Sequence, residues 1–170
     1  MKNTDPPNKF NKLNPELTRF IESMGMYFES QGIPRIGGRI LGLLMIAHEP
    51  LSADDIAKTL KVSRASVSTN LRPLTISGMV DKTSPLHDRT TYFVFSEAAL
   101  EQRMVAGIQS AAIFKKVAEQ GFAALPKQDP ARIRMQRSVE WSDLLVESFE
   151  NAITAWRKRY PDFSRLQKGV

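Results

Sequence analysis

Residues 51–72 read LSADDIAKTLKVSRASVSTNLR, and this stretch decides the fold of the chain. It predicts two short helices, opened by Ser52 and Ser63, whose side chains can cap the free N–H groups of each first turn. Residues 60–62 between the two helices leave room only for a sharp turn between packed helices. The pattern is therefore typical of a helix-turn-helix.

The second predicted helix keeps a polar face on its outside. Val67, Leu71 and Leu74 form its apolar side at spacings of four and three residues. The opposite side carries guanidinium, hydroxyl and methyl groups without a carboxylate: Arg64, Ala65, Ser68, Thr69 and Arg72. Arginine can bond a guanine edge through two N–H groups, and serine or threonine can bond base edges or phosphate. This face fits a DNA groove, and it also fits the solvated side of an ordinary helical hairpin.

The residues that follow predict two strands joined by a basic turn. Gly78 ends the helix, and residues 79–84 and 90–95 are predicted as strands, the second rich in β-branched and aromatic residues. Asp88 and Arg89 lie at the turn, which places the arginine where it can enter a minor groove. Two strands directly after a helix-turn-helix indicate a winged helix. The alternative for Arg89 is an ordinary surface ion pair.

Composition limits the possible functions. The 170 residues carry a formal net charge of +6 and a pI near 9.7, which suits a polyanionic partner, although many basic proteins bind no nucleic acid. The absence of cysteine and the two separate histidines exclude disulfides and predict no metal site. We also expect no cofactor and no enzyme activity, because no nucleophile–base pair or phosphate loop is found. With no signal-peptide core or membrane-length apolar run, the expected location is the cytoplasm.

Long helices are predicted on both sides of the winged helix. Asn14 caps the first of them, and Ser96 and Asp129 are predicted to cap two C-terminal helices that end near residues 119 and 160. The predicted fold is mainly α with a small β-wing. In chain order it has a disordered polar N-terminus (1–13), N-terminal helices (14–48), the winged helix-turn-helix (49–95), C-terminal dimerisation helices (96–160) and a basic tail (161–170).

The flanking helices carry apolar stripes that the small winged module cannot cover by itself. A homodimer whose N- and C-terminal helices interleave would bury these stripes. It would also set two recognition helices about 34 Å apart, one turn of B-DNA, on a pseudo-palindromic site. An elongated helical monomer is the alternative.

Two local features predict unusual helix packing. Gly37, Gly38 and Gly42 each cost about 1 kcal/mol in a helix relative to alanine. This cost indicates close approach by another backbone or by a ligand, or simple helix packing, which is the favoured cause. Pro73 lacks an N–H, so it is predicted to kink or end the recognition helix, and no DNA contact is expected beyond Arg72.

Three segments and the wing together resemble the GbsR-type branch of the MarR-like transcriptional regulators. They are GIPRIGGRILGLL (32–44), LSADDIA (51–57), SRASVSTNL (63–71) and the Asp88-Arg89 pair. The resemblance covers about residues 24–95 and implies a homodimeric winged-helix repressor that binds double-stranded DNA. The DNA-reading positions that it implies are Ser63, Arg64, Ala65, Ser66, Ser68, Thr69, Asn70, Arg72 and Arg89.

The resemblance also implies a small-molecule effector, since some members respond to choline or betaine-type osmolytes. A quaternary ammonium ligand needs several aromatic faces gathered into a cage. Aromatic residues on the flanking helices could supply them: Tyr27, Phe28, Trp141, Phe149 and Trp156. The same spacing is typical of aromatic residues in a helix core, which is the alternative.

The sequence thus predicts a sequence-specific, DNA-binding transcriptional repressor that acts as a homodimer. The alternative is a winged-helix module that binds other proteins and has no sequence-specific DNA binding. Such a module would not need Arg64, Arg72 and Arg89 on one surface. Neither the operator sequence nor the identity of an effector follows from the residues.

Overall fold

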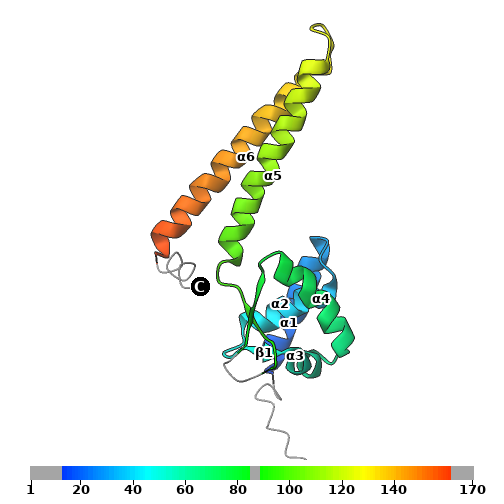
Figure 1. Cartoon of the computed structure of the whole chain (residues 1–170), viewed down its shortest axis with the longest axis vertical. Coiled ribbons are helices and arrows are strands. Elements are labelled where there is room, and N and C mark those ends of the chain that lie inside the picture. Colours follow the sequence, from blue (N-terminus) through cyan, green and yellow to red (C-terminus); the bar gives the residue numbers. More distant parts are fainter. Residues whose placement is uncertain (1–12, 85–88, 162–170) are drawn as a thin grey trace, which may run out of the picture. The chain divides into compact units, whose positions relative to one another are not determined.

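The computed structural model describes residues 13–84 and 89–161 of the chain (Figure 1). Most of the predicted N-terminal segment and basic tail, and the wing turn with Asp88, lie outside the described residues. The chain divides into an N-terminal unit, Met1–Ser96, and a C-terminal unit, Glu97–Val170.

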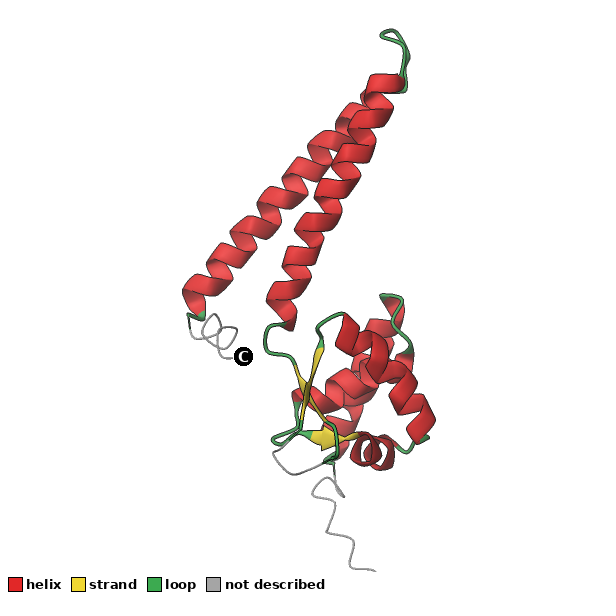
Figure 2. Cartoon of the chain, in the orientation of Figure 1, coloured by secondary structure: helices red, strands yellow, loops and turns green. Residues whose placement is uncertain are grey.

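The N-terminal unit is a small helical assembly with a three-stranded antiparallel sheet in the order β1-β3-β2 (Figure 2). Its elements are α1 (Pro15–Ser30), α2 (Arg35–Met45), β1 (Leu51–Ser52), α3 (Ala53–Leu60), α4 (Arg64–Ile76), β2 (Val80–Thr83) and β3 (Tyr92–Phe95). The mainly helical fold with a small β-wing, predicted from the sequence, is confirmed. The third strand, β1, was not predicted, because a pair of residues carries no alternating pattern.

Serine caps begin both helices of the helix-turn-helix, as predicted. The Ser52 hydroxyl accepts the Asp55 N–H at 3.1 Å, and the Asp55 carboxylate accepts the Ser52 N–H at 3.1 Å, which completes a capping box. The Ser63 hydroxyl accepts the Ser66 N–H at 3.1 Å. These bonds satisfy N–H groups that have no partner inside the helix, so the start of α4 is set by local sequence.

The core of the N-terminal unit lies around α2, which packs against α1, α3, α4 and β3. Its apolar side chains come from every helix and strand of the unit, and those that are fully buried include Ile40, Leu41, Leu43, Ile56 and Val67. Because α2 is buried on several sides, it forms the base on which the helix-turn-helix rests.

The glycines of α2 allow α1 to approach closely. A Cβ atom added to Gly38 would lie 2.6 Å from the carbonyl oxygen of Met24 and 2.9 Å from the Cα atom of Gly25. At Gly42 it would lie 3.0 Å from the Cβ atom of Met24. Of the explanations predicted for these glycines, the structure therefore supports helix packing, with the α1 backbone approaching closely at Gly38.

Pro73 does not end the recognition helix. Helix α4 continues through it to Ile76, and the Ser77 N–H bonds to the Pro73 carbonyl at 2.9 Å. Pro73 has no N–H, so the helix loses one backbone hydrogen bond there. Because Pro73 is exposed, its ring does not displace the side chains on the buried side of the helix.

The C-terminal unit is an antiparallel hairpin of two long helices, α5 (Ala99–Ala124) and α6 (Arg132–Arg159) (Figure 1). The predicted cap at Ser96 is wrong. Ser96 is 1% exposed, and its N–H donates to the Met79 carbonyl at 3.0 Å, which extends the pairing of the wing strands beyond β3. Helix α5 therefore begins only at Ala99, and it runs beyond the predicted end near residue 119.

The turn and the base of this hairpin are fixed by arginines. Near the turn, Arg132 donates to the carbonyls of Phe122 and Leu125 at 2.9 and 2.8 Å. At the base, the Arg157 Nε bonds to the buried Glu101 carboxylate at 3.0 Å, and this contact raises the pKa of Arg157. Among the described residues, no helix is long and apolar enough to cross a membrane.

Candidate nucleic-acid interface

Helix α4 presents the polar face that the helical period predicts. Its buried side chains include Val67, Leu71 and Leu74, which face the core. The exposed ones include Arg64, Ala65, Ser68, Thr69 and Arg72 together with the capping residue Ser63. Because α4 contains neither aspartate nor glutamate, its exposed side carries positive charge, hydroxyl groups and a methyl group but no negative charge. This surface, the α4 face, is the candidate interface.

Arg64 is held near the start of α3. Its Nε lies 3.3 Å from the Asp54 carboxylate, and its side chain is 70% exposed. An exposed ion pair of this kind contributes about 0–1 kcal/mol, so it orients the guanidinium more than it stabilises the fold. Helical spacing within one element does not reveal this contact, because it joins α3 and α4.

Asn70 does not belong to the α4 face. It is 8% exposed, and its Nδ2 donates to the Ser66 carbonyl at 2.8 Å. Its Oδ1 would lie 3.3 Å from a Cβ atom at Gly37, so the amide faces α2. The resemblance implied that Asn70 reads DNA, but a side chain in this position cannot reach a base edge while the helix stays packed. Ser66 is half-buried and donates its N–H to the Ser63 cap.

Among the described residues of the wing that precede β3, two cations are exposed, Lys82 of β2 and Arg89. Arg89 is exposed, as a groove contact requires. Asp88, predicted to brace it, lies outside the described residues. The minor-groove role of Arg89 therefore stays a prediction.

The aromatic residues predicted to hold an effector lie in both units. In the N-terminal unit, the Tyr27 and Phe28 rings meet edge to face with centroids 5.1 Å apart, and Tyr27 is 58% exposed. In the C-terminal unit, Trp141 is 59% exposed, the Phe149 ring covers Gly107, and Trp156 packs on Tyr160. The predicted cage is not tested by these contacts. Within the described parts of the chain, no three His, Asp or Glu side chains gather into a metal site.

Comparison with known proteins places this fold in a family. A sequence model of the MarR family matches residues 31–89, from just before α2 to the wing arginine. The HTH-type transcriptional regulator MmpR5 of Mycobacterium tuberculosis (strain ATCC 25618 / H37Rv) is 34% identical over 147 residues, which cover 86% of this chain and 87% of that protein. The chain belongs to the MarR family of transcriptional regulators. A crystal structure of a transcriptional regulator also matches this MarR-family chain, with 28% identity and a TM-score of 0.71 over 85% of this chain and 99% of that one.

The MarR-like winged helix predicted from the sequence is thereby confirmed. The proteins matched are transcriptional regulators rather than enzymes. The narrower assignment to the GbsR-type branch stays a prediction, because the relative reported above is MmpR5.

Proposed function

We propose that this MarR-family protein is a sequence-specific DNA-binding repressor that binds a pseudo-palindromic operator as a homodimer in the cytoplasm. The observation that carries the proposal is the α4 face. It exposes two arginines and several hydroxyls opposite a fully packed apolar side, with no carboxylate in the helix. An ordinary solvated helix is also polar on its outer side, but this one is the second helix of a helix-turn-helix in a MarR-family chain.

The proposal gives each group on the α4 face a role. Arg64 and Arg72 bond guanine edges in the major groove through their paired N–H groups. Ser68 and Thr69 bond base edges or phosphate, and the methyl group of Ala65 can contact a thymine methyl. The N-terminal N–H groups of α4, near Ser63 and Ser66, bind a phosphate where the helix dipole favours negative charge. Arg89 enters the flanking minor groove.

Exposed apolar side chains support the homodimer. In α5 they include Ile113, Phe114 and Val117, and in α6 Trp141 and Leu144, each between 50% and 65% exposed. Several large apolar side chains exposed on a helical hairpin favour a protein interface. A second copy of the chain fits best, because paired half-sites on DNA need a two-fold symmetric protein.

Repression and its release by an effector rest on the resemblance to GbsR-type regulators. We infer a small quaternary ammonium compound, choline or a betaine-type osmolyte, bound by some of the five aromatic residues named above. The measurement is the affinity of the protein for its operator with and without each compound. Unchanged affinity at millimolar concentrations would contradict the effector but leave DNA binding untouched.

Selection from random DNA duplexes tests the proposal. We expect the wild-type protein to enrich a pseudo-palindromic sequence, here called the selected duplex. Arg64→Ala and Arg72→Ala should each cost about 1–3 kcal/mol on this duplex and relax the base preference at one position of each half-site. Arg19→Ala, which removes an exposed arginine of α1, is the matched control and should leave the base preference unchanged.

If no sequence is enriched, the protein does not read DNA bases. The alternative predicted from the sequence, a winged-helix module that binds proteins, would then replace the proposal.

A further inference from the structure

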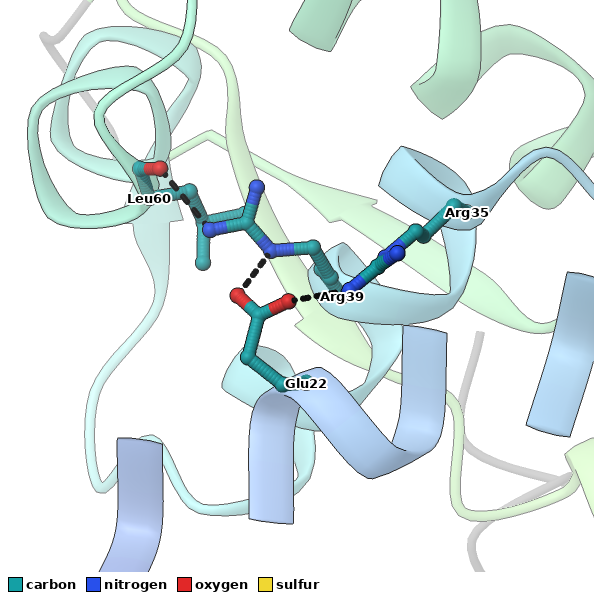
Figure 3. A network of polar contacts seen from close by, with 4 residues as sticks. All are labelled: Glu22, Arg35, Arg39 and Leu60. Atoms are coloured by element: carbon teal, nitrogen blue, oxygen red, sulfur yellow. Dashed lines mark hydrogen bonds and ion pairs between the residues drawn. The ribbon is translucent and has the colours of Figure 1, made fainter. Parts of the chain in front are cut away.

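Arg39 of α2 contacts two other helices at once (Figure 3). Its Nε lies 2.7 Å from a carboxylate oxygen of Glu22 in α1, and its Nη2 donates to the carbonyl of Leu60, the last residue of α3, at 3.0 Å. The other oxygen of Glu22 accepts from Arg35 at 3.2 Å. The side chain of Arg39 is 19% exposed, whereas that of Arg35 is 50% exposed. The two arginines thus share one carboxylate, but only Arg39 also reaches α3.

The path of Arg39 across α1 depends on Gly25. A Cβ atom at Gly25 would lie 2.8 Å from the Cγ atom of Arg39 and 3.1 Å from that of Arg35. Because Gly25 is buried and has no side chain, the arginine stem lies directly against the α1 backbone. The aliphatic part of the Arg39 side chain is therefore confined, which fixes the position of its guanidinium group between Glu22 and Leu60.

The Leu60 carbonyl, which accepts from Arg39, is the last carbonyl of α3 and lies at the start of the turn to α4. The last carbonyls of a helix lack partners inside the helix, and a cation is favoured at this end of the helix dipole. The next residue, Lys61, has a positive φ of 54°, a left-handed conformation that is strained for a residue with a side chain. The Val62 N–H bonds back to the Ala57 carbonyl at 3.1 Å, which closes the turn. Ser63 then begins α4.

We propose that Arg39 is a positioning residue for DNA reading. It does not touch DNA; it fixes the strained turn at Lys61 against α1 and α2, and so sets where the α4 face lies. The inference rests on the proposed function, because it assigns a support to the same recognition helix. Arginine suits this position because its guanidinium presents separate nitrogens: Nη2 donates to the Leu60 carbonyl, while Nε forms an ion pair with the Glu22 carboxylate on another helix.

Arg35 provides a matched control for the test. Arg39→Met removes both the Glu22 and the Leu60 contacts, while Arg35→Met removes a contact with the same carboxylate and leaves the Leu60 contact in place. Arg39→Lys keeps the charge beside Glu22 but loses the forked geometry. Affinity is measured for the selected duplex and for a random-sequence duplex at a temperature where every variant is folded. Amide hydrogen exchange of Lys61, Val62, Ser66 and Val67 is measured without DNA.

We expect Arg39→Met to weaken binding to the selected duplex at least tenfold and to the random duplex much less. Exchange at the four amides should quicken, and Arg39→Lys should fall between Arg39→Met and wild type. Arg35→Met should change the affinity by less than twofold. Equal losses for Arg39→Met and Arg35→Met would overturn the proposal, as would unchanged exchange at the turn. If Arg39→Met does not fold, Arg39→Lys is compared with Arg35→Met by the same criteria.

Failure of the proposed function would be seen separately. If the wild-type protein selects no duplex, the DNA-reading function is wrong. Faster exchange at the four amides in the Arg39 variants would then still support the link between Arg39 and the turn, while unchanged exchange would refute it.

Discussion

The two units of this chain bury their apolar residues to very different degrees. In the N-terminal unit, large side chains such as Ile40, Leu41 and Leu43 are fully enclosed by helices and the small sheet. In the C-terminal hairpin, the buried described residues are mostly small or polar: Ala99, Glu101, Ala111, Ala118, Ser142 and Ile153. Its large apolar side chains include Ile113, Phe114, Val117, Trp141 and Leu144, all exposed.

The difference follows from the number of elements available. A helix must bury its apolar stripe against another element, and α2 finds such partners on several sides. The hairpin offers each helix only one neighbour, so any second apolar stripe stays outside. The N-terminal unit should therefore be stable by itself, while the hairpin should gain stability from a partner. The predictions below test this contrast, beginning with the largest expected effect.

The first prediction compares one substitution in both units. Leu43→Ala removes a fully buried side chain of α2 and should lower the free energy of unfolding by about 2–5 kcal/mol at every protein concentration. Leu144→Ala removes a side chain that is 57% exposed, so its cost should appear only where the chains associate. Urea unfolding over a range of protein concentrations measures both. If Leu43→Ala and Leu144→Ala lowered the free energy of unfolding by similar amounts at every protein concentration, the proposed contrast between the two units would be wrong.

The second prediction concerns association through the hairpin. Val117→Glu puts a charge on the exposed apolar face of α5 and should weaken the homodimer at least a hundredfold, or about 2.8 kcal/mol. Sedimentation equilibrium should give a mass near twice the 19.1 kDa chain for wild type and a lower average mass for the variant. Ala123→Glu, at another exposed position of α5, is the control and should stay dimeric. A monomeric wild type would refute the proposed dimer.

The third prediction compares two glycines that lie at helix contacts. Gly38→Ala would press a methyl group against the backbone of α1 and should cost about 1–3 kcal/mol. Gly107→Ala would meet the Phe149 ring at 2.7 Å, and a ring at the edge of a thin hairpin can move aside. Thermal unfolding should therefore show the larger loss for Gly38→Ala. A larger loss for Gly107→Ala would mean that the hairpin is the more tightly packed unit.

The smallest effect is expected at the ion pair between α5 and α6. Lys115 Nζ lies 2.6 Å from the Asp143 carboxylate, and this bond raises the pKa of Lys115. A lysine whose pKa is higher in the folded than in the unfolded protein stabilises the folded state fully at pH values below its pKa in the unfolded chain. This stabilisation is lost as the pH rises through its pKa in the folded protein. The difference in urea midpoint between wild type and Lys115→Met should thus be equal at pH 6 and pH 8 and shrink above about pH 10.5. A difference that changes between pH 6 and pH 8 would point to another group.

Local features of this fold could be predicted from the sequence because their causes lie within a few residues. The caps at Ser52 and Ser63 depend on N–H groups at most three residues away. The outward face of α4 follows from its helical period alone. The cap expected at Ser96 failed because a contact with Met79 extends the sheet pairing, and this contact joins residues far apart in the chain.

Contacts between elements explain the rest of what the sequence did not show. Asn70 falls close to the polar side of α4 by periodicity, but the small Gly37 on α2 leaves room for its amide to be buried. Arg39 lies within the predicted N-terminal helices, and its bond to Leu60 spans 21 residues. No spacing rule within one helix predicts such a contact.

The central claim is that the N-terminal unit reads DNA and the hairpin joins two chains so that they read it together. The most direct measurement is the mass of the complex on the selected duplex and on a duplex that carries one half-site. The account predicts two chains of 19.1 kDa on the selected duplex and at least a hundredfold weaker binding to the half-site. One chain per duplex, with equal affinity for both, would contradict it.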